Sequence, residues 1–153
     1  KTVEIQDNSI ENIAVTSASD AAKRCHFPVF VEDAGLFIKS LSGFPGPYSS
    51  YVFQTIGTAG ILKLMKNIDD RDACFHSVVA FCKPKEKPIT FHGRVEGKIV
   101  HEEKGKRGFG FDPIFVPLKG DGKTFAEMET AEKNRFSHRA GALREFAKWY
   151  IRQ

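Results

Sequence analysis

The feature that most constrains the fold is a pair of long runs rich in β-branched and aromatic residues, 73–82 and 89–101, on either side of the segment 83–88. Such residues favour a pleated, half-buried strand, and the Pro-containing segment between them favours a turn. The pattern predicts a long β-hairpin. Shorter strand and helix patterns surround it without strict alternation, so we expect an α/β fold with a mixed β-sheet flanked by helices.

The first third of the chain predicts a helix and two short strands. Residues 8–24 carry apolar residues at helical spacing, and Asn8 with Glu11 predicts a capping box at the helix start. After Pro28, the run 29–31 predicts a short buried strand. We expect a sharp turn at Gly35 and a second short strand over 36–38.

The remaining elements are a loop and two helices, with one more strand. Residues 42–47 are rich in Gly and Pro and predict a loop, a helix is expected over 58–68, and a short strand over 114–116. The last helix is expected to start after an N-cap at Ser137 and to run to Ile151. Its predicted inner face consists of Leu143, Phe146, Ala147 and Tyr150.

Composition limits the function classes. With 153 residues the chain predicts one domain, 1–153, and no apolar run approaches the roughly twenty residues that span a bilayer. There is no signal-peptide pattern, and the three scattered cysteines predict reduced thiols, so we expect a cytoplasmic protein with no membrane partner. The net charge of +4 fits a nucleotide or a nucleic acid equally well.

Residues 108–139 contain the types of side chain that form a nucleotide-binding pocket. Aromatic faces stack on bases, Lys and Arg neutralise phosphates, and Ser and His hydrogen-bond base edges. The candidate residues are Phe109, Phe111, Asp112, Lys133, Ser137, His138 and Arg139. Each residue also has a purely structural interpretation. The phenylalanines can belong to the core, and for Phe111 the core and the binding interpretations are about equally supported. Ser137 can be a plain N-cap, and the charged residues can be surface groups.

The adjacent acids Glu32 and Asp33 are of the type that Mg²⁺ prefers as ligands. On a regular strand the two side chains would point to opposite faces. At a strand end before the expected turn at Gly35, both can approach one ion. Alternatively, they are surface acids of a turn.

The chain resembles the inosine triphosphate pyrophosphatase, or Ham1-like, family. Five segments match that family's motifs in order and spacing: 32–36, 43–49, 108–115, 124–128, and 132–134 with 137–139. The resemblance implies two lobes around an elongated sheet with a central cleft. It also implies a homodimer that does not act on nucleic acid and hydrolyses ITP, dITP and XTP, with Mg²⁺, to the monophosphate and pyrophosphate.

The same resemblance implies roles for individual residues. Asp33 and Glu4 would flank the attacking water, and Glu4, Glu32 and Asp33 would hold the metal ion. The candidate residues between Phe109 and Arg139 would bind the nucleotide, with Phe109 as the stacking face. Donors at 137–139 would donate hydrogen bonds to the 6-keto oxygen of a purine and disfavour the 6-amino group of adenine.

The N-terminal strand, loop and helix of the family have no counterpart in this sequence. We expect a fragment of a longer protein; a natural short form and a degenerate member are the other readings. Two alternative functions stay open, a noncatalytic nucleotide- or nucleic-acid-binding domain and a Maf-like nucleotide pyrophosphatase with another base preference.

Overall fold

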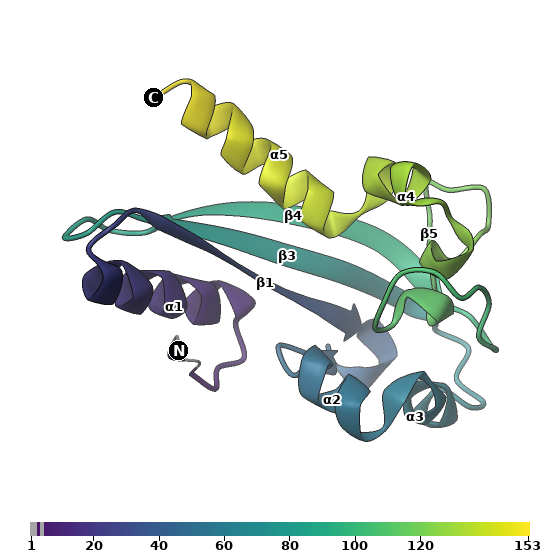
Figure 1. Cartoon of the computed structure of the whole chain (residues 1–153). Coiled ribbons are helices and arrows are strands. Elements are labelled where there is room, and N and C mark those ends of the chain that lie inside the picture. Colours follow the sequence, from purple (N-terminus) through teal and green to yellow (C-terminus); the bar gives the residue numbers. More distant parts are fainter. Residues whose placement is uncertain (1–2, 4) are drawn as a thin grey trace.

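A computed structural model describes residues 3 and 5–153, and a twisted antiparallel sheet runs through its length (Figure 1). The sheet has the strand order β2-β1-β3-β4-β5, and all its pairs are antiparallel. Its strands are β1 (Val29–Ile38), β2 (Pro45–Gly46), β3 (Asp72–Cys82), β4 (Ile89–Ile99) and β5 (Phe115–Pro117).

The predicted hairpin is confirmed and forms the centre of the sheet. β3 and β4 are each eleven residues long and pair from Phe81 and Ile89 at the turn to Asp72 and Lys98 at the far end. β1 pairs with the other edge of β3 over its whole length. β3 therefore has a neighbouring strand on each edge, and its second half is buried.

Helices cover both faces of the sheet, as the α/β prediction requires. Figure 1 shows α1 (Ile10–Cys25) below the sheet and α5 (His138–Ile151) above it. The other helices surround the end of the sheet away from the hairpin turn. They are α2 (Ser49–Thr55), α3 (Gly57–Leu64), α4 (Thr130–Phe136) and the 3-10 helices η1 (Lys39–Leu41), η2 (Asp112–Ile114) and η3 (Phe125–Glu127).

The two faces of the sheet carry separate apolar clusters. Under α1, small side chains such as Ala14 and Ala18 pack on Val78 and Ala80. On the opposite face a larger cluster joins the sheet to α2, α3, η2 and η3, with Phe75 and Phe115 near its centre, their rings 4.6 Å apart. The larger cluster forms the floor beneath the loop that follows β4.

The start of α1 differs from the prediction by two residues. The N-cap is Ser9, whose hydroxyl accepts a hydrogen bond from the Asn12 amide, and not Asn8. Ser9 is in turn fixed by Asp7, whose Oδ1 accepts from the Ser9 amide at 2.7 Å. The predicted capping box between Asn8 and Glu11 is therefore wrong, because a neighbouring Ser-Asp pair occupies the helix start.

The predicted turn at Gly35 is also wrong, because β1 is one continuous strand of ten residues. Gly35 serves a close approach between strands. A Cβ at this position would lie 2.2 Å from the carbonyl oxygen of Gly46 in β2. The glycine therefore lets β2 pair against β1, and Glu32 and Asp33 fall inside a regular strand.

Two helix predictions need correction. The predicted helix over 58–68 is α3, which ends at Leu64, and a separate helix, α2, precedes it. In α5 the N-cap and the C-terminal residue are confirmed, but the inner face is displaced by about one position. Phe146 does face the sheet, together with Ala142 and Trp149, whereas Leu143, Ala147 and Tyr150 are exposed.

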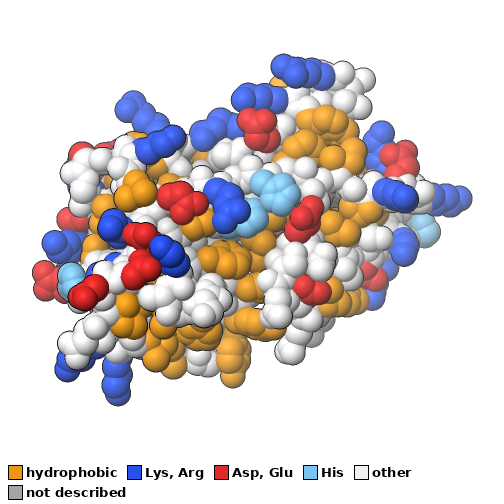
Figure 2. Space-filling model, turned by 180° about the vertical axis from the view of Figure 1, so that it is seen from behind, with side chains coloured by type: hydrophobic (Ala, Val, Ile, Leu, Met, Phe, Trp, Pro, Cys, Tyr) orange, Lys and Arg blue, Asp and Glu red, His pale blue; other side chains and the backbone are white. Residues whose placement is uncertain are grey.

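Charged side chains of both signs are interspersed over the surface. On the side shown in Figure 2, Lys and Arg alternate with Asp and Glu and do not form one continuous basic stripe. Within residues 3 and 5–153, no helix combines the length and apolar character needed to span a bilayer.

The contact between α5 and β4 at Gly93 leads to a stability prediction. A Cβ at Gly93 would lie 1.9 Å from the His138 carbonyl oxygen and 2.5 Å from the Ala142 amide nitrogen. Since this helix backbone cannot be displaced without moving α5, we expect Gly93→Ala to reduce the free energy of unfolding by about 1–3 kcal/mol. Chemical denaturation measures the change. In the control variant Gly120→Ala the added Cβ has no atom nearer than 3.2 Å, and equal stabilities of the two variants would contradict the prediction.

Candidate nucleotide site

Three segments distant in sequence meet beside the larger apolar cluster. They are the second half of β1, the loop that precedes η2, and the first turn of α5. They enclose a cavity of about 280 Å³ together with α2. Its lining includes Ala34, Leu36, Ser50, Phe53, Phe75, Phe109, Phe111, Asp112, His138 and Arg139.

Phe109 is the exposed aromatic ring of the site. Its side chain is on the surface, with 59% of the residue accessible, and two cations lie over the ring. The Lys133 ammonium and the Arg139 guanidinium carbon are each 4.6 Å from the ring centroid. An aromatic face next to two cations is suited to a stacked base that carries phosphates.

Lys133 is held in place by a buried carboxylate. Asp112 is only 3% exposed, and its Oδ2 accepts from Lys133 Nζ at 2.5 Å and from the Phe109 amide at 2.9 Å. One carboxylate therefore fixes both the lysine and the backbone of the loop that presents the ring. The attraction between the ammonium and the carboxylate offsets part of the cost of burying both groups.

Arg139 is held by a second carboxylate, that of Glu32 on β1. Glu32 Oε1 accepts from Arg139 Nε at 3.0 Å and from the hydroxyl of the fully buried Ser77 at 2.6 Å. Ser77 lies on β3, on the same face of the sheet as Glu32. The arginine is thus tied to the sheet while its guanidinium covers Phe109.

His138 is buried at the start of α5 as a neutral imidazole. Its ring stacks on Phe75, with centroids 4.6 Å apart and an interplanar angle of 6°. Burial, the largest cause, acts together with the charges of Arg139 and Lys133 to lower the pKa of His138 to about 3. In the part of the chain that the structure describes, the buried Nδ1 has no hydrogen-bond partner. It is therefore a polar group available to a ligand.

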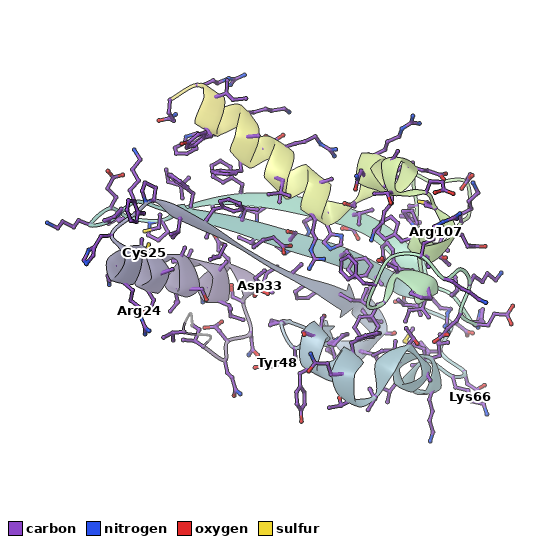
Figure 3. The ribbon with its side chains drawn as sticks, viewed as in Figure 1. Arg24, Cys25, Asp33, Tyr48, Lys66 and Arg107 are labelled. Atoms are coloured by element: carbon purple, nitrogen blue, oxygen red, sulfur yellow. The ribbon has the colours of Figure 1, made fainter. Side chains whose placement is uncertain are left out.

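Asp33 lies on the opposite face of β1 from Glu32. It borders a second, larger cavity of about 710 Å³, between the first turns of α1 and the start of α2. Figure 3 shows Asp33 below β1, on the α1 side, with Tyr48 beyond it. Ser50 borders both this cavity and the cavity beside Phe109, so the two adjoin.

Most of the predicted binding residues come together. Phe109, Asp112, His138 and Arg139 line the cavity of about 280 Å³. A further cavity of about 590 Å³ is lined by Phe109, Lys133, Ser137, His138 and Arg139, and Ser137 also caps α5 by accepting from the Ala140 amide at 3.1 Å. Phe111 is 4% exposed and packs edge-on against Phe53 at 5.5 Å, so the structure places it in the core. Only its edge can contribute to the cavity.

The described residues include two of the three predicted metal ligands, Glu32 and Asp33. Glu4 lies outside them. Glu32 and Asp33 alternate across the regular strand β1 and both border the larger cavity, so a metal ion shared between them stays a prediction. Among residues 3 and 5–153, no group of three or more His, Cys, Asp and Glu side chains has the geometry of a metal site.

Sequence reasoning missed two residues of this site, Ser77 and Phe75. Both lie on the α5 face of β3, and they hold Glu32 and His138 respectively. Only their alternation within a predicted strand could have placed them on one face. Their partners are set by tertiary packing.

Comparison with known proteins identifies close relatives. The Ham1 family matches residues 1–149. The dITP/XTP pyrophosphatase of Methanothermobacter marburgensis is 56% identical over 142 residues, covering 93% of this chain and 75% of that protein. The dITP/XTP pyrophosphatase of Methanopyrus kandleri is 52% identical over 147 residues, covering 96% and 78%.

Two solved structures have the same fold. A HAM1 protein from Coxiella burnetii matches with a TM-score of 0.93 and 31% identity, covering 100% of this chain and 82% of that one. The Ham1 protein of Staphylococcus aureus matches with a TM-score of 0.91 and 29% identity, covering 99% and 80%.

The buried neutral imidazole of His138 predicts a dependence of stability on pH. Its pKa is about 3 in the folded protein, against 6.5 for an unperturbed histidine, so below pH 6.5 the unfolded chain binds more protons. Stability therefore falls as the pH is lowered from 6.5 towards 3, by up to about 1.4 kcal/mol per pH unit. His76, whose pKa burial lowers to about 4, adds to the fall.

Denaturation of the His138→Gln variant between pH 7 and about pH 4.5 tests this dependence. We expect a shallower decline than in the unaltered protein. The exposed His101→Gln is the control and should leave the slope unchanged. An unchanged slope in His138→Gln would show that the imidazole does not stay neutral.

Proposed function

We propose that this chain, which belongs to the Ham1 family, hydrolyses non-standard purine nucleoside triphosphates, ITP, dITP and XTP, to the monophosphate and pyrophosphate. The observation that carries the proposal is the convergence of Phe109, Lys133, His138 and Arg139 on one cavity wall. Relatives that are about half identical and named dITP/XTP pyrophosphatases support the reaction. Such an enzyme removes these nucleotides from the cellular pool.

The base is proposed to lie beside Phe109 and to be selected at the start of α5. The first amides of a helix have no partner within the helix, and Arg139 adds side-chain donors. A 6-keto oxygen accepts from such donors. The 6-amino group of adenine would place donor against donor, at a cost of about 1–3 kcal/mol for each unpaired group.

The phosphates are proposed to extend from this cavity towards Asp33. The adjoining cavity at Ser50 gives them a path, and the Asp33 carboxylate borders it. Asp33 is the group that we propose takes the proton of the attacking water. Glu4, to which the sequence gives a similar role, lies outside the described residues.

Mg²⁺ is the proposed cofactor, and the described residues fit it only in part. Asp33 fits, because Mg²⁺ is commonly held by one or two carboxylates together with substrate phosphates. Glu32 does not fit, because its Oε1 accepts two hydrogen bonds on the other face of β1. When bound, Mg²⁺ neutralises the charge of the phosphate oxygens.

The remaining features of the proposal come from the sequence. Chain length and composition predict one domain over residues 1–153, a cytoplasmic location and no membrane partner, and the resemblance implies a homodimer that does not act on nucleic acid. The interspersed charges of Figure 2 support a small anionic substrate over a nucleic acid, which needs a basic surface. A monomer mass in light scattering would rule out the homodimer.

A chromatographic assay with Mg²⁺ and ITP, XTP, ATP or GTP tests the function. We expect IMP and pyrophosphate from ITP and little reaction of ATP. Nucleotide binding without turnover would indicate a noncatalytic domain. Faster turnover of another base would favour the Maf-like alternative, and release of diphosphate and phosphate would disprove the proposed bond cleavage.

The role of Asp33 is tested by Asp33→Asn. Loss of a general base typically lowers the rate by about 10²–10⁴-fold, so we expect turnover to fall by at least about a hundredfold. Because Asp33 and Phe109 line different cavities, nucleotide affinity should change by less than about threefold, within about 0.7 kcal/mol. Pyrophosphate release and calorimetry measure the two quantities. The control is the exposed Asp69→Asn, and full activity of Asp33→Asn would refute the assignment.

A further inference from the structure

We propose that Ser77 and Glu32 are positioning residues, which hold Arg139 over Phe109 for nucleotide recognition, and that Glu32 is not a ligand of the metal ion. The inference rests on the proposed function for its role in catalysis. Its structural part concerns three residues, and each of the contacts between them is observed.

The contacts form a chain from the sheet interior to the surface. Ser77 is fully buried and donates to Glu32 Oε1 at 2.6 Å. The same oxygen accepts from Arg139 Nε at 3.0 Å, and the Arg139 guanidinium lies 4.6 Å from the Phe109 centroid. A rigid strand therefore sets the position of a side chain that is 39% exposed.

The nitrogen that Glu32 binds determines what the arginine can still do. A guanidinium has five N–H donors in a planar fork, and Nε–H carries one of them. Within the described part of the chain, Arg139 makes its remaining contact with the Phe109 ring. Its terminal nitrogens can thus donate to a base carbonyl or a phosphate without breaking the bond to Glu32.

The contacts of Glu32 are those of a residue that holds the Arg139 side chain in place. A divalent ion at its carboxylate would stand next to the Arg139 guanidinium, and like charges at this range repel. The ion would also compete with Ser77 and Arg139 for Oε1. Glu32 and Asp33 both border the cavity proposed for the phosphates, but Glu32 directs its Oε1 to Ser77 and Arg139, on the face of β1 opposite to Asp33. The two neighbouring acids therefore have separate tasks.

Asp112 and Lys133 form a second carboxylate–cation pair next to Phe109. There, too, a carboxylate fixes a cation that lies over Phe109. Two cations of one site are thus each held by a carboxylate of the protein before any nucleotide binds. Side chains fixed in this way lose less conformational freedom on binding.

Steady-state kinetics with dITP at varied Mg²⁺ test the proposal. For Glu32→Ala we expect KM to rise about tenfold, because Arg139 is then no longer held in the orientation that binds the nucleotide. The kcat should stay within about twofold, and the Mg²⁺ concentration for half-maximal rate should not change. Glu32→Gln retains an acceptor oxygen and should recover part of the affinity. Ser77→Ala should raise KM by less than Glu32→Ala does.

The exposed Glu102→Gln is the matched control and should behave as the unaltered protein. A large fall in kcat together with a shift of the Mg²⁺ dependence in Glu32→Gln would overturn the proposal and make Glu32 a metal ligand. An unchanged KM in Glu32→Ala would overturn it as well.

A readout independent of hydrolysis separates this proposal from the proposed function. In ¹⁵N-labelled protein, the Arg139 Nε–H resonance should be protected from exchange, and Arg139→Lys assigns it by its disappearance. Protection should be lost in Glu32→Ala and reduced in Ser77→Ala. If the protein does not hydrolyse dITP but shows this pattern, the positioning holds and the proposed function fails. Equal protection in all variants that retain Arg139 would refute the positioning.

Discussion

The site depends on one close contact, between the backbone of α5 and the backbone of β4 at Gly93. Because Gly93 has no side chain, the His138 carbonyl and the Ala142 amide lie where a Cβ would stand. This approach brings the start of α5 down onto the sheet, so that the His138 ring stacks on Phe75 and Arg139 reaches Glu32. A helix held one side-chain layer further away could make neither contact.

The two ion pairs next to Phe109 differ in how strongly they stabilise the fold, because they differ in burial. The Asp112 and Lys133 side chains are 4% and 14% exposed, and removal of one partner of such a pair typically costs about 3–5 kcal/mol, because a charge stays buried without compensation. The Glu32–Arg139 pair is more exposed, at 22% and 39%, and is screened by solvent. The first pair therefore stabilises the loop, while the second contributes mainly to the orientation of the arginine.

Periodicity and capping predicted the parts of the fold that depend on local sequence. The hairpin of β3 and β4 and the start of α5 at Ser137 are examples. Gly35 was misread because a glycine within a strand pattern suggests a turn, and its actual cause, the approach of Gly46, is a tertiary contact. Phe109 and Phe111 each follow a glycine in the sequence, yet one is exposed and the other buried. The anchoring of Glu32 joins residues 45 and 107 positions away in sequence, which no local pattern indicates.

We infer that one nucleotide occupies both adjoining cavities, with its base at Phe109 and its phosphates towards Asp33. A crystal structure with Mg²⁺ and a dITP analogue that has an imido link between the α- and β-phosphates tests this placement. We expect a base against Phe109, the 6-keto oxygen within hydrogen-bond distance of donors at His138 or Arg139, and the Arg139 Nε still bonded to Glu32. A base bound elsewhere, or a metal ion on Glu32 with Arg139 displaced, would contradict it.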